Sequence, residues 1–490
     1  MTFAPTSFRI YSTGLLSDEE AVTGIPYGQS NALATKTVTP SQRLRSEAIV
    51  VHPAPPVPDE RAPLIRGSST LSESSYANSE ATSSTVNEYG QSTFGQTLFN
   101  CVAMLVGIGL LSVPLAFAYS GWLMGTVLIL SYGFISCYTA KILGRIILTD
   151  TSLRCYSDIA RKAFGPWSTP FISLMFCLEL FAVSVLLVTL YADSLHSLLP
   201  RFSADTYKLS SLILILPTVF LPLSFLSYSS ILGILSTIVI IFVILVDGLS
   251  KQTAPGSLWS PAETSLGVSS WANIGIAFGL FIAGFGCHPL IPSLAQDMVE
   301  PHKFERMINL AFAIATFIYA LMAVTGYLMF GDSVSGEISM DLLKMDGYNK
   351  PLNHFALWML ALSPLSKFAL TTQPLTATLE ILLRIEVPRG PSNDEMAKMS
   401  GKQVARENVN RALRIVQRIC VTLLSVVMSV LVPGFSEILA FLGCSSAFML
   451  CVIGPLAANA SISGRCGITD GVIMVLALTM AVWGTIALFL

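Results

Sequence analysis

The sequence predicts an all-α protein that crosses a membrane many times. Of its 490 residues, 53% are hydrophobic and only 12% are charged, whereas soluble proteins carry roughly 25% charged residues. The mean hydropathy is +0.66, and long apolar stretches follow one another from residue 97 onward. Because lipid offers the backbone no hydrogen-bond partners, apolar stretches of about 20 residues cross a bilayer as helices.

Eleven apolar stretches are long enough to span a hydrocarbon layer about 30 Å thick. The fourth and fifth are separated only by Ser227-Tyr228, so one long kinked helix is the alternative there. The predicted spans are 97–119, 121–147, 168–195, 207–226, 229–248, 270–294, 306–329, 354–383, 412–432, 434–458 and 469–489.

Residues 1–90 are predicted to be a disordered cytosolic tail, ahead of a transmembrane domain at 91–490. The tail is rich in Ser, Thr and Pro, and it has too little apolar surface to offset the entropy of ordering. It shows no apolar signal-peptide segment. Glu60, Leu64 and Ile65 match the spacing of an acidic dileucine sorting signal, which a cytosolic sorting adaptor binds. A chance match is the alternative.

The distribution of Lys and Arg predicts that the N-terminus is cytosolic. Cytosolic loops carry an excess of these residues, and this placement leaves most of the 28 on the cytosolic side. Arg201, Lys208, Lys251, Lys344 and Lys350 fall on the opposite side. With eleven spans, the C-terminus lies in a vacuolar lumen or outside the cell.

Two spans contain glycine-rich breaks at corresponding positions, Gly107-Ile108-Gly109 in the first and Gly284-Phe285-Gly286 in the sixth. Glycine breaks inside lipid are tolerated beside protein or a wet cavity. Paired breaks indicate an inverted five-plus-five repeat with a substrate site near the midplane. An unwound helix end offers N–H donors to a carboxylate, and freed carbonyls suit an ammonium group, so a zwitterionic amino acid matches both. Close helix packing is the alternative.

Three ionisable residues inside the predicted spans are candidates for ion coupling. His288 follows the second break and belongs to a residue type that titrates near neutral pH, so it either carries a proton or is a structural histidine. Glu179 either carries the coupling proton or caps a helix contact. Lys367 either supplies a fixed positive charge beside the first break, where related transporters bind sodium, which makes transport sodium-independent, or pairs with backbone carbonyls.

Several functional classes lack support in the sequence. We find no nucleophile–base pair, phosphate-binding loop or metal-ligand cluster, so an enzyme, a catalytic residue and a cofactor are not expected. The nine cysteines show neither metal-ligand spacing nor a disulfide framework. The net charge of −2 implies no nucleic-acid partner. The expected partners are substrate, protons and membrane lipid.

Six short runs carry a family resemblance: Gln96-Thr97-Leu98-Phe99-Asn100, Gly107-Ile108-Gly109-Leu110-Leu111-Ser112-Val113-Pro114, Tyr156-Ser157-Asp158-Ile159, Leu221-Pro222-Leu223-Ser224, His288-Pro289 and Pro301-His302-Lys303-Phe304. In this order they resemble the amino acid/auxin permease family over about residues 91–490. The run Glu179-Leu180-Phe181-Ala182-Val183-Ser184-Val185 is most similar to the vacuolar amino-acid transporters of fungi and plants.

The resemblance implies an eleven-helix fold of the amino acid–polyamine–organocation type. It implies proton-coupled transport of amino acids, often neutral ones, across the vacuolar membrane. Gly107, Ile108 and Gly109 are then expected to hold the substrate backbone, and residues Gly284 to His288 to line its side-chain pocket. Two alternatives stay open: an amino-acid sensor that signals through its tail, and a permease of the plasma membrane.

Overall fold

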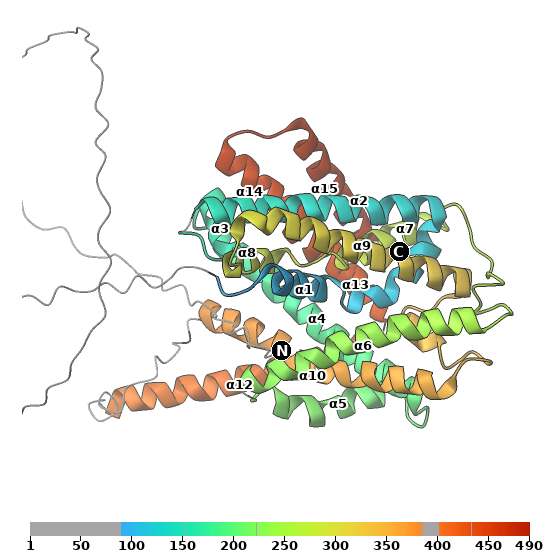
Figure 1. The fold of residues 1–490 in the computed structure, drawn as a ribbon. Coiled ribbons are helices and arrows are strands. Elements are labelled where there is room, and N and C mark those ends of the chain that lie inside the picture. Colours follow the sequence, from blue (N-terminus) through green and yellow to red (C-terminus); the bar gives the residue numbers. More distant parts are fainter. Residues whose placement is uncertain (1–89, 151, 222, 384, 386–400, 433) are drawn as a thin grey trace, which may run out of the picture. The chain divides into compact units, whose positions relative to one another are not determined.

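A computed structural model describes residues 90–490 apart from 151, 222, 384, 386–400 and 433 (Figure 1). The predicted tail lies outside the described residues, and with it the sorting motif of Glu60, Leu64 and Ile65. The described residues are helices and loops, with one isolated β-bridge between Ser92 and Met298.

Helices follow one another along the whole described chain. The longer ones are α1 (Phe94–Leu105), α2 (Val113–Thr149), α3 (Tyr156–Phe164), α4 (Ser168–Leu198), α5 (Ala204–Thr218), α6 (Leu223–Ser250), α7 (Trp271–Ala283), α8 (Ile291–Asp297), α9 (Phe304–Phe330), α10 (Lys350–Leu382), α12 (Gly401–Leu431), α13 (Phe435–Leu442), α14 (Gly454–Ser463) and α15 (Ile468–Ala487). Short 3-10 turns are η1 (Ile108–Ser112), η2 (His288–Leu290), η3 (Pro301–Lys303), η4 (Gly331–Ser333) and η5 (Ile338–Asp341), and η6 (Gly443–Ile453) is a π-helix.

These elements confirm a polytopic all-α fold. In the described part, nine helical stretches are long and apolar enough to cross a membrane. The first of them, Ile108–Thr149, holds parts of two predicted spans, because Gly121 divides it with a φ of +70°. The remaining span is α5, which has 15 residues. It ends at Thr218 and α6 begins at Leu223, so the alternative of one long kinked helix is wrong. The predicted boundary at Ser227-Tyr228 is wrong as well, because both residues lie inside α6.

The first and sixth spans, which are the two that break, share helix neighbours, and a second group of helices packs around α10. Helix α2 contacts α7 and α9, α1 contacts α9, and α10 contacts α4 and α6. Figure 1 shows α2 and α9 running side by side. Five spans precede the sixth, and an odd number of crossings makes the second half enter the membrane from the opposite side, as an inverted repeat requires.

Two local structures were not predicted. The loop after the second span contains α3, an amphipathic helix with Asp158 in its first turn and Arg161 and Lys162 in its last, as the helix dipole favours. The tenth span contains η6, and such π-helical segments often lie at functional sites. The loops after α4, α6 and α9 share the side that the charge distribution places away from the cytosol, which we call the far side.

Candidate functional site

The first break lies where it was predicted. Helix α1 ends at Leu105, and Val106 leaves the helical conformation with φ −86° and ψ 78°. Gly107 is extended, with φ −116° and ψ −150°, before the chain restarts as η1. A Cβ on Gly107 would have Met104 O, at 3.8 Å, as its nearest neighbour. A methyl group at position 107 would therefore make only ordinary contacts.

The second break also lies where it was predicted, between α7 and α8. Helix α7 ends at Ala283, and α8 begins at Ile291. Phe285 is 1% exposed, and its ring lies 5.3 Å from that of Tyr319 and 6.5 Å from that of Phe312, measured between centroids. The predicted side-chain pocket is therefore filled by the protein's own aromatic rings in this conformation.

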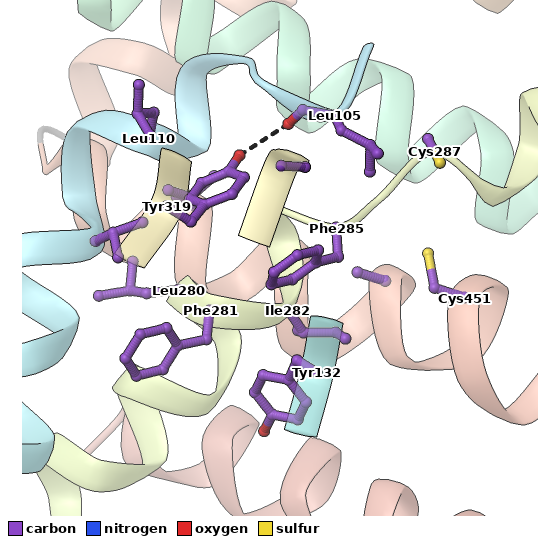
Figure 2. Close-up of a cluster of buried hydrophobic side chains, with 14 of the residues drawn as sticks. Leu105, Leu110, Tyr132, Leu280, Phe281, Ile282, Phe285, Cys287, Tyr319 and Cys451 are labelled. Atoms are coloured by element: carbon purple, nitrogen blue, oxygen red, sulfur yellow. Dashed lines mark hydrogen bonds between the residues drawn. The ribbon is translucent and has the colours of Figure 1, made fainter. Parts of the chain in front are cut away.

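The two breaks touch each other. A Cβ on Gly109 would lie 3.2 Å from the Cα of Gly284, so each glycine permits the other's approach. The hydroxyl of Tyr319, on α9, lies 2.9 Å from Leu105 O and 3.1 Å from Gly284 O. Figure 2 shows this side chain between the two broken helices, with its bond to Leu105. One phenol thus bridges carbonyls from both breaks.

Tyr319 was missed by the sequence reasoning. A signal existed, because a buried tyrosine hydroxyl nearly always finds a hydrogen-bond partner. Tyr319 lies in the middle of an apolar span and is 2% exposed. The sequence does not show which carbonyls the hydroxyl reaches.

A small cavity of about 10 Å³ lies beside the first break, enough for roughly one water molecule. Gly107 and Ile108 line it together with Lys367 of α10. Its other polar lining comes from Ser363 of α10 and from Ser236 and Thr237 of α6. Lys367 therefore lies beside the first break, where it was expected.

The stem of Lys367 is held against helix α6. A Cβ on Gly233 would lie 2.1 Å from the Cε of Lys367 and 2.9 Å from its Nζ. A larger residue at position 233 would therefore displace the lysine. This close approach fixes where the ammonium group enters the cavity.

Glu179 lies near the second break. Its Oε1 is 3.9 Å from the position that a Cβ on Gly286 would occupy. Its Oε2 is buried and has no hydrogen-bond partner among the described residues. Because a buried, unpartnered carboxylate is costly in this setting, the group is better accommodated when it is protonated.

His288 belongs to a different contact. It is fully buried, and its Nε2 lies 2.8 Å from Thr139 Oγ1 and 3.1 Å from Ser136 O, both on α2. Its ring meets Phe312 edge-on at 6.2 Å. The histidine therefore joins η2 to α2, and it is absent from the lining of the cavity at the first break.

Comparison with known proteins agrees with this architecture. The profile of the family described as transmembrane amino acid transporter protein matches residues 90–490. Amino acid transporter AVT1E of Arabidopsis thaliana is 29% identical over 386 residues, which cover 76% of this chain and 67% of that protein. Vacuolar amino acid transporter 5 of Schizosaccharomyces pombe is 24% identical over 272 residues, which cover 51% and 61% respectively.

A solved structure shares the fold. The manganese transporter of Eremococcus coleocola, solved as a point mutant, aligns with a TM-score of 0.50 at 14% identity, covering 82% of this chain and 89% of that one. The profile match spans nearly all of the described chain and confirms the predicted resemblance. The chain therefore belongs to the transmembrane amino acid transporter protein family, which is a family of transporters and not of enzymes.

Proposed function

We propose that this protein carries neutral amino acids across the vacuolar membrane by alternating access, coupled to protons and independent of sodium. The observation that carries the proposal is the meeting of the two breaks beside a cavity that Lys367 lines. Gly107, Ile108 and Gly109 hold the amino and carboxyl groups of the substrate, because an unwound segment offers both donors and acceptors.

The aromatic filling of the second break supports an occluded conformation. Phe285 and Tyr319 occupy the space next to Gly284, and the remaining cavity is too small for an amino acid. Substrate entry therefore requires Gly284, Phe285 and Gly286 to move away from the first break. Loss of the Tyr319 bridge is the local event that accompanies this opening.

Lys367 makes the site independent of sodium. In its ammonium form, Lys367 repels a second cation from the place beside Gly107 and Ile108, and it supplies the charge that a sodium ion would otherwise bring. Replacement of sodium by potassium in the assay buffer is therefore expected to leave uptake unchanged.

Glu179 is the stronger of the two candidate proton carriers. Its carboxyl adjoins the moving second break, and one of its oxygens lacks a partner among the described residues. The Nε2 of His288 has two contacts to α2, and its Nδ1, like Glu179 Oε2, has no hydrogen-bond partner among the described residues. The choice between the two therefore rests on the position of Glu179 beside Gly286. We assign the coupling proton to Glu179, and to His288 the structural role of holding η2 against α2.

The vacuolar location rests on relatives and on the tail. The fission yeast relative is named a vacuolar transporter, and Glu60, Leu64 and Ile65 fit a signal that sorting adaptors bind on the way to vacuoles. A permease of the plasma membrane is the alternative. Leu64→Ala with Ile65→Ala is expected to move the tagged protein out of the vacuolar membrane. An unchanged location would show that the motif does not direct sorting.

Uptake into vacuolar vesicles tests the transport proposal. Labelled neutral amino acids are expected to accumulate in vesicles that contain the protein, with or without sodium, and an uncoupler is expected to abolish accumulation. Glu179→Gln is expected to lose accumulation while it retains exchange of labelled for unlabelled substrate, because exchange needs no net proton movement. Sodium-stimulated uptake, or normal accumulation by Glu179→Gln, would contradict the assignment.

One contact favours a second function, that of a sensor which reports substrate through its tail. The backbone of Ser92 donates to Asp297 O at 2.7 Å and accepts from Val299 N at 2.9 Å. The Ser92 hydroxyl also bonds the Asp297 carboxylate. The segment that leads into the tail is thereby attached to the end of α8. A tail-deleted protein that still transports but no longer signals would favour this function.

A further inference from the structure

The far-side loop between α9 and α10 is attached to the first broken helix. The hydroxyl of Ser112, at the end of η1, donates to Gly336 O at 2.5 Å. A Cβ on Gly336 would lie 3.0 Å from Ser436 Oγ of α13. Ile338, which begins η5, is fully buried and reaches Gly326 of α9. This loop therefore closes over the far-side end of the helices that bear the first break.

Two carboxyl groups meet beneath this loop. Glu337 is fully buried, and Asp193, in the last turns of α4, is 8% exposed. Their carboxyl groups are close enough to influence each other directly, and helix α4 packs against η5, which begins one residue after Glu337. Two ionised carboxylates side by side repel each other and have no hydrogen to share, so the pair is best accommodated with one proton between them. Glu337 Oε1 is buried and has no hydrogen-bond partner among the described residues.

The surrounding charges do not neutralise both carboxylates. Lys208 of α5 is 1% exposed, and its Nζ donates a hydrogen bond to Ser429 O at 2.8 Å. It also lies 3.6 Å from Asp205 Oδ1, so one lysine serves several acids. His196 lies one turn beyond Asp193, and its Nδ1 is 2.8 Å from Phe202 O.

The remaining contact on the loop side is a neutral hydroxyl. Ser339 Oγ donates to Glu337 Oε2 at 3.3 Å. Burial is the main cause that raises the pKa of Glu337 well above its ordinary range, and the neighbouring Asp193 raises it further. The pair thus keeps its proton at a pH where an exposed glutamate is ionised.

We propose that Asp193 and Glu337 form a proton-binding site that locks the far-side loop onto α4 and thereby closes the far-side entrance to the first break. Loss of the shared proton leaves two carboxylates facing each other in a poorly solvated place, and their repulsion separates the loop from α4. The site is distinct from Glu179, because it lies at the far end of α4 and not beside the second break.

The sign of the pH dependence follows from linkage. The closed loop holds the proton more tightly than the open loop does, because opening exposes Glu337 to water. The closed state is therefore fully favoured at low pH and is lost as the pH rises through the raised pKa of Glu337. An acidic far side shifts the equilibrium toward the closed entrance, and a neutral far side shifts it toward the open one.

Thiol labelling from the far side tests this proposal in the full-length protein. Ile338→Cys places a thiol that is buried while the loop is closed. Gly267→Cys is the matched control, because position 267 is an exposed far-side residue with nothing within 4 Å of a Cβ. A membrane-impermeant thiol reagent is applied to the far side from about pH 5 to about pH 8, a range above the ordinary titration of glutamate.

The ratio of the two labelling rates cancels the pH dependence of the thiol itself, since both proteins share it. This ratio is expected to rise severalfold with pH, and to stay low and flat when Glu337→Gln is added. The glutamine amide donates to Asp193 permanently and mimics the shared proton. Protein without an introduced cysteine measures the background labelling of the native cysteines.

Either of two results would overturn the proposal: a flat ratio in the otherwise native protein, or an undiminished rise in the presence of Glu337→Gln. Asp193→Asn repeats the test from the other partner if the glutamine variant does not reach the membrane. Labelling requires no transport. An inactive but pH-responsive protein would therefore count against the proposed transport function and not against the lock.

Discussion

The two breaks have nearly the same sequence, Gly-Ile-Gly and Gly-Phe-Gly, but their surroundings differ. The first borders a small cavity with hydroxyl groups and Lys367 on its walls. The second is packed against Tyr319 and Phe312, and His288 fastens its end to α2. The neighbours of a glycine break therefore differ, and in the proposed function so do their purposes: the first break exposes backbone to the substrate, and the second lets two segments approach and move.

The available space at each glycine makes the comparison quantitative. A Cβ on Gly107 would meet its nearest atom at 3.8 Å, which is ordinary contact. A Cβ on Gly284 would lie 2.8 Å from the Cζ of Tyr319. We therefore expect substitutions at the first break to act on binding, and substitutions at the second to act on packing.

The largest effect is expected from Gly284→Ala. Because the added methyl overlaps a buried ring, overpacking is expected to cost about 1–3 kcal/mol and to separate the two breaks. Uptake is expected to fall to background, and the midpoint of thermal unfolding in detergent to drop. Gly95→Ala is the matched control, because nothing lies within 4 Å of a Cβ there. Equal behaviour of both variants would show that the breaks do not depend on close contact.

The next effect is expected from Lys367→Met, which keeps the length of the stem and removes its charge. Uptake is expected to fall at least about tenfold, as the loss of a charged contact worth roughly 1.5–3 kcal/mol implies. Lys350→Met, at an exposed lysine that begins α10, is the control. Full activity of Lys367→Met at normal membrane abundance would remove the charge from the site at the first break.

A smaller effect is expected from Tyr319→Phe, which keeps the ring and removes the bridge. Leu105 O and Gly284 O each lose a contact, and an unsatisfied buried group costs about 1–3 kcal/mol. Thermal stability is expected to drop, and uptake to fall severalfold. Tyr132→Phe serves as the reference, because it removes a hydroxyl that makes one contact, to the sulfur of Met480. If both variants lose the same thermal stability, the bridge contributes no more to stability than an ordinary single contact.

The smallest effect is expected on the pH dependence of uptake by His288→Ala. The histidine is fully buried, and Thr139 and Ser136 hold its Nε2. The variant is expected to be less stable and slower, with its pH profile unchanged in shape. A shifted profile, measured as the initial rate across a pH series, would return His288 to the proton path.

Hydropathy and the glycine pattern were enough to predict both breaks and the spans other than the fourth and fifth, because each depends on local sequence. Helix α3, the π-helix η6 and the division between α5 and α6 required the structure. Local backbone features and packing against neighbouring helices decide where a helix bends, and a hydropathy pattern does not reveal that position. The roles of the predicted site residues remain proposals, although the structure places Lys367 beside the first break and Glu179 beside the second.

By itself, the sequence determined that this chain lies in a membrane, where its helices run, which two of them break and to which family it belongs. In lipid, a span must be apolar over its whole length and must form its backbone hydrogen bonds within its own helix, so local sequence is enough to identify it. Tertiary structure alone decided that Tyr319 bridges the breaks and that Asp193 meets Glu337. These contacts join residues that lie far apart in the chain or on separate helices, and their partners are chosen by packing in three dimensions.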